Sequence, residues 1–338
     1  MKIAIDAMGG DKGPGVIIDG AMQAARELGV EVILVGDQDI LNSELTHHNL
    51  EGLKISIRHA PEVVEMEESA SIAIRKKKRS SIRIATELVK TGEAEAIISA
   101  GNTGAAMATA KILLGALKGV ERPAIATLLP TVKGFALLLD VGANVDCRPR
   151  HLLQFAIMGH IYSKNILGVE NPKIGLLNIG EEESKGNELT KESFKTLKNG
   201  GLNFIGNVEG KDLYNGEVDV VVCDGFIGNV ALKISESVAE MISSHFQQEI
   251  KRKFLWKLGY LLMRSCFKNF KKKVDYDEYG GAPLLGINGV CIICHGRSGA
   301  KAIKNAIKVA ASFIQCNVNH HIQSYLSFQI RDEITAKG

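Results

Sequence analysis

Short apolar runs, each ended by a glycine or a polar residue, recur along the chain. Seven of them predict strands, at residues 2–6, 31–35, 96–99, 135–140, 173–178, 218–224 and 290–294. Between them, apolar residues at helical spacing predict helices at 15–28, 81–91, 103–117, 150–166, 227–248 and 299–315. Strands that alternate with helices indicate an α/β fold with a largely parallel sheet. Strands that are apolar throughout fit burial on both faces of that sheet.

Polar side chains follow most of the predicted strands, nearly always beside a glycine. In open parallel sheets, ligands bind outside the carboxyl ends of the strands. We therefore expect these strand ends to line one crevice. They carry Asp6, Asp11, Asn102, Asp140, Asn144, Asn178, Asp224 and His295.

Glycine-rich loops at these strand ends are suited to binding an anion. Gly9 and Gly10 leave backbone N–H groups open to a ligand. Residues 101–104, Gly-Asn-Thr-Gly, begin a predicted helix, whose free N–H groups and partial positive charge attract phosphate. Thr103 as an ordinary helix cap is the alternative. The loop is not a Walker A motif, and no strand is followed by the GxGxxG pattern of dinucleotide-binding proteins.

Three further residues are candidates for the same chemistry. Lys185 follows the acidic run 181–183, where it can pair with a phosphate oxygen as a point charge or simply balance the glutamates. His295 opens a glycine turn after a predicted strand. Asn229 lies near a predicted helix start, where it caps the helix or reaches the crevice.

The composition is that of a globular α/β protein. The 338 residues are 45% apolar and only 5% aromatic, with 35 glycines, and we expect one large or two medium domains. We expect no membrane-spanning helix, because no uncharged apolar run of 18 residues occurs. Without a signal peptide, the six cysteines read as reduced thiols of a cytoplasmic protein.

Positive charge is concentrated in one segment. Residues 251–273 hold nine of the 41 basic residues and no acid, which leaves 32 basic against 38 acidic residues elsewhere. On a helical wheel, the apolar side chains face away from a lysine stripe, as in helices that lie in an anionic membrane surface. The alternative is packing on the protein or on a second subunit. We expect no nucleic-acid partner, which would more often meet charge spread over a face. The apolar face carries Phe254, Leu255, Trp256, Leu258, Leu261 and Leu262.

Eight short motifs together resemble the bacterial phosphate acyltransferase family of phospholipid synthesis. They are IDAMGGD (5–11), SAGNTGA (99–105), ERPA (121–124), LDVGANVDC (139–147), QFAIMG (154–159), LLNIGEEESKG (176–186), VCDGFIGNV (222–230) and YGGAPLLG (279–286). The resemblance runs from the first residues to about 315, with departures at Arg79 and Arg297.

The resemblance implies transfer of a long-chain acyl group from the thioester of acyl carrier protein to inorganic phosphate. It also implies that the acyl-phosphate passes to a membrane-embedded glycerol-3-phosphate acyltransferase. The implied fold is a three-layer α/β/α sandwich, similar to phosphotransacetylases and to isocitrate/isopropylmalate dehydrogenases. We expect a single catalytic domain over 1–338 with a helical excursion at about 250–273, a homodimer, and no cofactor or metal.

These expectations define a candidate site and two rival functions. One rival is an NAD(P)-dependent dehydrogenase of the isopropylmalate type; the other is a membrane-binding module without catalysis. For the acyltransferase, we expect association with the inner face of the membrane from the cytoplasm. Its predicted catalytic residues are Lys185, Asn102, His295 and Asp6. Its predicted binding residues are Gly9, Gly10, Asp11, Gly101, Thr103, Gly104, Asp140, Asn144, Asn178, Asp224 and Asn229.

Overall fold

A computed structural model describes residues 1–274 and 278–335, and the last three residues of the predicted domain lie outside the described part. The strands are β1 (Lys2–Asp6), β2 (Glu31–Gly36), β3 (Ile55–His59), β4 (Ala96–Ser99), β5 (Ala124–Pro130), β6 (Phe135–Leu139), β7 (Ile174–Leu177), β8 (Phe204–Val208), β9 (Val220–Val222), β10 (Ala282–Leu285) and β11 (Val290–Ile293). The helices are α1 (Pro14–Leu28), α2 (Gln38–Leu45), α3 (Ala70–Lys76), α4 (Ser81–Lys90), α5 (Thr103–Leu113), α6 (Pro149–Leu167), α7 (Glu188–Lys198), α8 (Asp212–Asn215), α9 (Gly225–Arg252), α10 (Phe254–Leu262), α11 (Arg264–Val274), α12 (Ala300–Gln315) and α13 (Val318–Thr335).

The predicted sandwich is confirmed. An 11-stranded sheet runs in the order β3-β2-β1-β4-β11-β10-β5-β6-β9-β7-β8. One buried apolar cluster packs α1, α6 and α12 on one face, and a second packs α4 and α5 on the other. All seven predicted strands and all six predicted helices are present, with ends displaced by a few residues.

The sheet reverses direction in its middle. Strands β3, β2, β1, β4 and β11 are mutually parallel, and so are β6, β9, β7 and β8. Between the two groups, β10 and β5 make three successive antiparallel pairings. The two parallel groups therefore point in opposite directions. The expectation that seven strand ends share one edge of a parallel sheet is wrong, because it assumed a single direction throughout.

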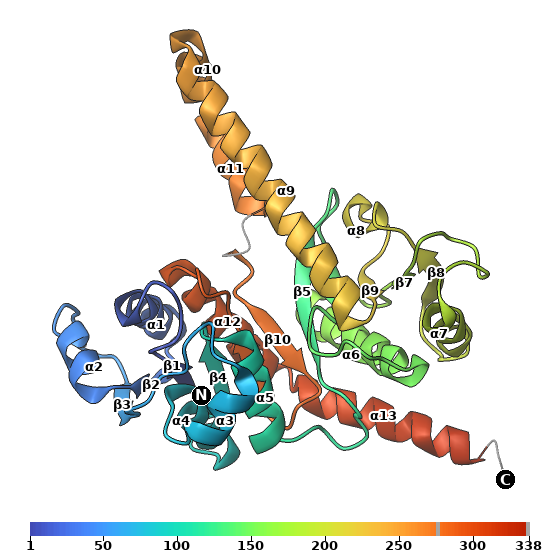
Figure 1. Ribbon diagram of the computed structural model, residues 1–338, viewed down its shortest axis with the longest axis horizontal. Coiled ribbons are helices and arrows are strands. Elements are labelled where there is room, and N and C mark those ends of the chain that lie inside the picture. The colour runs from blue at the N-terminus through green and yellow to red at the C-terminus, as the bar shows by residue number, and fades with distance from the viewer. Residues whose placement is uncertain (275–277, 336–338) are drawn as a thin grey trace.

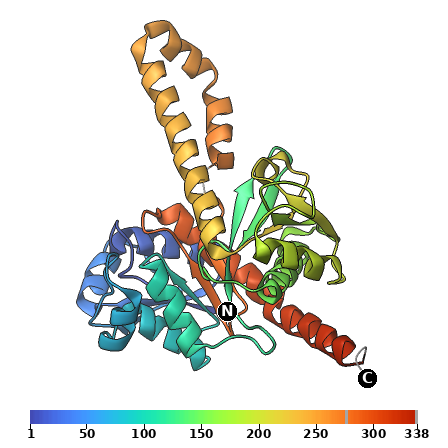
Figure 2. The ribbon, with the colours of Figure 1, turned by 45° about the vertical axis from the view of Figure 1, so that its right-hand side comes forward.

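Two lobes result, with β10 running between them (Figure 1). The first lobe holds β1–β4, β11 and the helices packed on them, and the second holds β6–β9 with α6–α8. From the junction, α9 projects outward for 28 residues, and α10 and α11 turn back along it (Figure 2). In the part of the chain that the structure describes, no helix is long and apolar enough to cross a membrane.

Candidate active site

Asp6 ends β1 beneath the glycine loops of the first lobe. Its Oδ2 accepts a hydrogen bond from Ser99 Oγ at 2.7 Å, and Ser99 Oγ accepts one from Gly101 N–H at 3.1 Å. Its Oδ1 has no hydrogen-bond partner among the described residues. Burial raises the pKa of Asp6 above its usual value. At 3% exposure, Asp6 supports the loops from below and does not face a ligand.

The loops above Asp6 pack backbone against backbone. A Cβ on Gly9 would lie 2.7 Å from the nitrogen and 2.8 Å from the Cα of Gly101. Gly10 has a φ of 96°, which favours glycine. The N–H of Asp11 donates to the carbonyl oxygen of Gly296 at 2.9 Å, which ties this loop to the end of β11. The loops after β1, β4 and β11 therefore meet at one rim of the first lobe.

Asn102 has a structural position at this rim. Its Oδ1 accepts a hydrogen bond from a backbone N–H in the first turn of α5, at 2.9 Å. Its Nδ2 donates to the carbonyl oxygens of Glu65, Met66 and Glu68, at 3.3, 2.8 and 2.9 Å. Asn102 thereby anchors a neighbouring segment, while Thr103, the next residue, faces the cavity described below.

Asp140 organises the corresponding loop of the second lobe. Its carboxylate accepts four backbone hydrogen bonds, from Ile125, Gly142, Ala143 and Asn144, at 2.7 to 3.3 Å. A fifth comes from the Asn144 side chain at 2.9 Å. Asp140 is fully buried, and burial raises its pKa. Both side chains therefore hold the loop in shape from within.

Asp224 sets the start of α9. It caps the helix by accepting hydrogen bonds from the N–H groups of Phe226 and Ile227 at 2.9 and 3.0 Å. The N–H of Gly225 donates to the carbonyl oxygen of Asn144 at 2.7 Å, which joins α9 to the Asp140 loop. This junction directs one face of α9 toward the first lobe.

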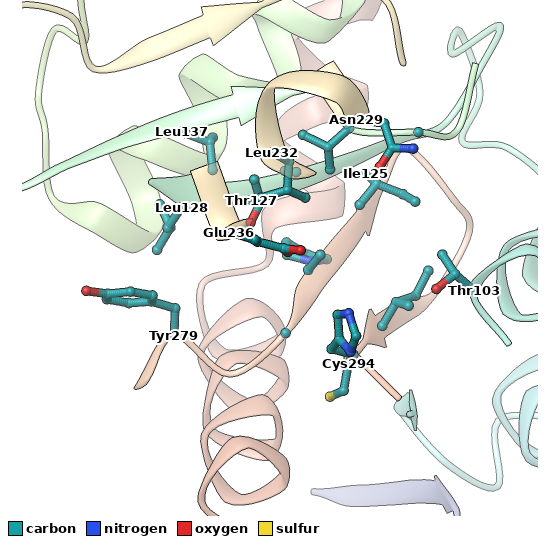
Figure 3. Close-up of a pocket in the computed structure, with 18 of the residues that line it drawn as sticks. Thr103, Ile125, Thr127, Leu128, Leu137, Asn229, Leu232, Glu236, Tyr279 and Cys294 are labelled. Atoms are coloured by element: carbon teal, nitrogen blue, oxygen red, sulfur yellow. The ribbon is translucent and has the colours of Figure 1, made fainter. Parts of the chain in front are cut away.

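A cavity of about 360 Å³ lies between the lobes, bounded by β5, β10, β11 and the beginnings of three helices (Figure 3). Thr103 from α5, Asn229 from α9 and Ser298 before α12 line it. The first turn of a helix leaves backbone N–H groups free, and α5 and α12 can offer such groups to an anion. In α9 they are already taken, because the N–H groups of Gly225, Phe226 and Ile227 donate to Asn144 and Asp224. Four of the predicted site positions lie on the cavity or its loops: Thr103, Asn229, His295 and, through the adjacent Gly142, the Asp140 loop.

Lys233 is the lysine that lines this cavity. Its ammonium pairs with Glu236 at 2.8 Å, and both side chains face the cavity from α9. An ammonium has three N–H donors, so this pair leaves two for a ligand. The side chain of Glu236 is 13% exposed against 54% for Lys233, so the carboxylate holds the flexible lysine near the inner wall.

His295 faces the same space from the end of β11. Its Nδ1 accepts a hydrogen bond from the backbone N–H of Arg297 at 3.2 Å, so its proton sits on Nε2. Burial, and then the positive charge of Lys233, lower the pKa of His295. A neutral imidazole with an Nε2–H donor is therefore available at neutral pH.

The other end of the cavity is apolar. Leu128 and Tyr279 lie together at one side of the cavity, away from Thr103 and Asn229 (Figure 3). The Tyr279 ring packs edge-on against Phe135, with ring centroids 5.0 Å apart. The cavity thus has a polar end and an apolar end.

Lys185 and Asn178 lie elsewhere. The Lys185 carbonyl accepts a hydrogen bond from Asn178 Nδ2 at 3.2 Å, in the exposed loop between β7 and α7. Neither residue lines the cavity as the described residues form it. Lys233 and Glu236, which do line it, are not among the predicted site residues. A signal was present, because positions 229, 232, 233 and 236 share one face of the predicted helix.

The basic segment differs from a single amphipathic helix. The backbone is extended at Lys253, between α9 and α10, and α10 ends at Leu262 before α11 turns back. The predicted wheel over 251–273 is therefore wrong as one continuous helix. Its apolar side chains are exposed nonetheless, at the outer end of the hairpin that α9, α10 and α11 form. The exposed set is Phe254, Leu255, Trp256, Leu258, Leu261 and Leu262, at 40% to 81%.

Comparisons with known proteins agree on one family. Residues 1–321 match the family model described as "Fatty acid synthesis protein". The chain is 59% identical over 322 residues to the phosphate acyltransferase of Geotalea daltonii, which covers 95% of this chain and 93% of the relative. It is 54% identical over 338 residues to the phosphate acyltransferase of Pelotomaculum thermopropionicum, with 100% and 97% covered.

Solved structures agree on the fold. A phosphotransacetylase from Streptococcus pyogenes superposes with a TM-score of 0.65 at 17% identity, covering 93% of this chain and 94% of that one. The EutD phosphotransacetylase from Staphylococcus aureus gives 0.60 at 14% identity, with 94% of each chain covered. The expected similarity of the fold to phosphotransacetylases is therefore confirmed.

The sequence matches assign an enzyme family, which removes the two rival functions. At more than 50% identity over nearly its whole length, this chain belongs to the family of the phosphate acyltransferases.

Proposed function

We propose that the protein transfers a long-chain acyl group from acyl carrier protein to inorganic phosphate, which gives acyl-phosphate for phospholipid synthesis. One observation carries this proposal: a single cavity between the lobes is polar at one end and apolar at the other. Phosphate fits the polar end, at the starts of α5 and α12 and beside Asn229 and Lys233 of α9. The acyl chain fits the apolar end beside Leu128 and Tyr279.

The reaction needs little from the protein beyond placement and charge. A phosphate oxygen attacks the thioester carbonyl carbon, the C–O bond forms, and the C–S bond then breaks to release the carrier thiolate. Because phosphate is the nucleophile, no protein nucleophile is required. Burial raises the pKa of Cys147 and Cys291 to about 12, so these thiols stay protonated.

The cavity side chains divide between binding and stabilisation. Lys233 and Asn229 hold phosphate oxygens as charged and neutral donors, together with Thr103 at the start of α5. The Nε2–H of His295 donates to the carbonyl oxygen as negative charge develops there. Glu236 positions the Lys233 ammonium and takes no part in bond making.

The hairpin of α9, α10 and α11 supports the membrane part of the proposal. Its outer end exposes Phe254, Leu255 and Leu262 at 74% to 81%, and Lys253 stacks over Trp256 at 4.7 Å. A basic, apolar tip of this kind suits an anionic membrane surface. We infer a cytoplasmic enzyme that visits the inner face of the membrane and passes its product to a membrane-embedded glycerol-3-phosphate acyltransferase.

We also propose that the protein forms a homodimer. Apolar side chains are exposed along α9 well before the tip, including Ile234, Val238 and Met241 at 44% to 59%. Exposed apolar side chains that follow one another along a helix favour a contact surface.

The test of the function is direct. Long-chain acyl carrier protein is incubated with the enzyme, with and without phosphate, and acyl-phosphate is trapped with hydroxylamine while carrier thiol is titrated. We expect thiol release only with phosphate, and a Lys233→Ala variant with at least a tenfold higher phosphate KM. Lys191→Ala, which removes an exposed lysine of α7, is the matched control. Thiol release that does not depend on phosphate would refute the proposal.

A further inference from the structure

The basic run 75–79, Arg-Lys-Lys-Lys-Arg, has no part in the chemistry above. It forms the end of α3 and the turn that follows. Arg75, Lys76 and Lys78 are exposed, and the described residues offer none of them an ion pair. Lys77 differs, because it turns inward to Glu68 at 2.6 Å and to the carbonyl oxygen of Val63. Three unpaired positive charges therefore point outward from a short stretch of backbone.

This run is fixed to the rim of the cavity. The segment before α3 is held by the Asn102 side chain, which donates to three of its carbonyl groups. Met66, in the same segment, packs so closely on Gly296 that a Cβ there would lie 2.6 Å from Met66 Cε. Gly296 follows His295, which lines the cavity. One end of the segment is therefore part of the rim.

The other end of the segment is anchored as well. The N–H of Ser81 donates to the carbonyl oxygen of Glu62 at 3.0 Å, and the N–H of Arg79 donates to the Glu62 carboxylate at 2.7 Å. Helix α3 itself packs on α5, whose first residue lines the cavity. Its seven residues span about 10 Å, so the unpaired charges lie only that far beyond the rim.

We propose that the outer face of α3 and the turn after it, residues 72–79, form the docking surface for the acidic protein that delivers the thioester. This inference rests on the proposed function, because it names the surface that the acyl donor's carrier uses. The carrier docks beside the rim, and its flexible prosthetic arm reaches from there into the cavity.

Charge complementarity favours a protein partner over a membrane. The outer face of α3 combines Ile72, 47% exposed, with Arg75 and Lys76 one turn further on. A single apolar side chain among exposed cations suits the acidic face of a helical protein. The outer face of α3 lacks the cluster of large apolar residues that the outer end of the hairpin carries, so it is less suited to a membrane surface. Two glutamates of the same segment are already engaged within it, because Glu68 is paired with Lys77 and the Glu62 carboxylate accepts the N–H of Arg79.

The test compares two acyl donors that share the thioester and differ in the carrier. A triple variant, Arg75→Glu, Lys76→Glu and Lys78→Glu, is assayed with long-chain acyl carrier protein and with the uncharged acyl-pantetheine. We expect the KM for acyl carrier protein to rise at least tenfold. We expect kcat and KM for acyl-pantetheine to stay within twofold of the wild type, because the cavity is untouched. The rise in KM should shrink between 50 and 300 mM salt, as screening weakens the attraction.

A control with the same change in charge isolates the surface. The second lobe exposes Lys164, Lys191 and Lys195, and their replacement by Glu should leave kcat and KM unchanged for both acyl donors. An unchanged KM for acyl carrier protein in the α3 variant overturns the docking surface, as does an equal loss with both donors. Loss of binding to vesicles of anionic phospholipid, with the carrier KM unchanged, assigns the run to the membrane and also overturns it. If the wild type cleaves neither donor in a phosphate-dependent way, the proposed function fails instead.

Discussion

Asp6 and Asp140 are both buried carboxylates at strand ends, yet their replacement by Asn should change the free energy of unfolding by very different amounts. Asp140 accepts five hydrogen bonds, three at Oδ1 and two at Oδ2. An Asn can keep one acceptor oxygen only, so at least two donors, both from Asn144, would face an NH₂ group. Each buried unsatisfied donor costs about 1–3 kcal/mol, so we expect Asp140→Asn to lower the free energy of unfolding by about 2–6 kcal/mol.

Asp6 accepts one hydrogen bond in good geometry, from Ser99 at Oδ2, and its Oδ1 has none among the described residues. The Ser81 hydroxyl and the N–H groups of Met8 and Gly9 favour its charged form more weakly than burial opposes it. Asp6→Asn can place its NH₂ at the Oδ1 position and keep the bond to Ser99. The substitution also removes a buried charge, and we expect a loss of less than about 1 kcal/mol in the free energy of unfolding.

The pH dependence of stability gives a second readout. Burial raises the pKa of Asp6 above its ordinary value of 3.8, so the folded protein binds its proton at higher pH than the unfolded chain does. The contribution of Asp6 to wild-type stability is therefore greatest below pH 3.8 and is lost as the pH rises through the folded pKa. Asp6→Asn does not titrate, so relative to the wild type it should gain stability over that window.

The assay is urea unfolding followed by circular dichroism, at several pH values. Asp39→Asn, an exposed substitution with the same charge change, is the control and should stay within about 0.5 kcal/mol of the wild type. Equal losses for Asp6→Asn and Asp140→Asn, or a loss below about 1 kcal/mol for Asp140→Asn, would refute this reasoning.

Three further predictions concern the site and the hairpin. Gly9→Ala should lower kcat at least tenfold, because its Cβ would lie 2.7 Å from a backbone atom of the facing loop; Gly134→Ala, with open space around it, is the control in the same assay. At saturating phosphate, kcat should show no decline due to His295 as the pH falls to 6.5, since the pKa of His295 is lowered; a decline centred above 6.5 that disappears in His295→Gln would contradict this. Leu258→Glu with Leu262→Glu should abolish binding to anionic vesicles and spare turnover in solution, and vesicle binding that survives would exclude the hairpin tip.

The reversal of strand direction in the sheet could have been predicted from the lengths of two connections between strands. The predictions included β6 and β11 but not β5 and β10, and every strand was assumed to be parallel. The connections β5–β6 and β10–β11 span only residues 131–134 and 286–289. Parallel strands need a crossover of a dozen or more residues, so connections this short require antiparallel pairing. Recognising them would have predicted two lobes and a cleft between them.

Local features were determined by the sequence alone. Asn102 and Asp224 cap the helices that follow them, and apolar runs form strands, because each feature depends on residues near one another in the chain. The close backbone approach at Gly9 is to Gly101, 92 residues further on, and belongs to the tertiary structure. The tertiary structure decided which lysine lines the cavity that the described residues form, because Lys233 does so and Lys185 does not. A lysine lines the cavity only if its helix begins at the junction of the lobes with the right face inward. That placement depends on strand directions and on contacts between segments more than 80 residues apart, such as Gly225 with Asn144. Periodicity along the chain carries no information about such contacts, because it reports which residues share a face and not what that face meets.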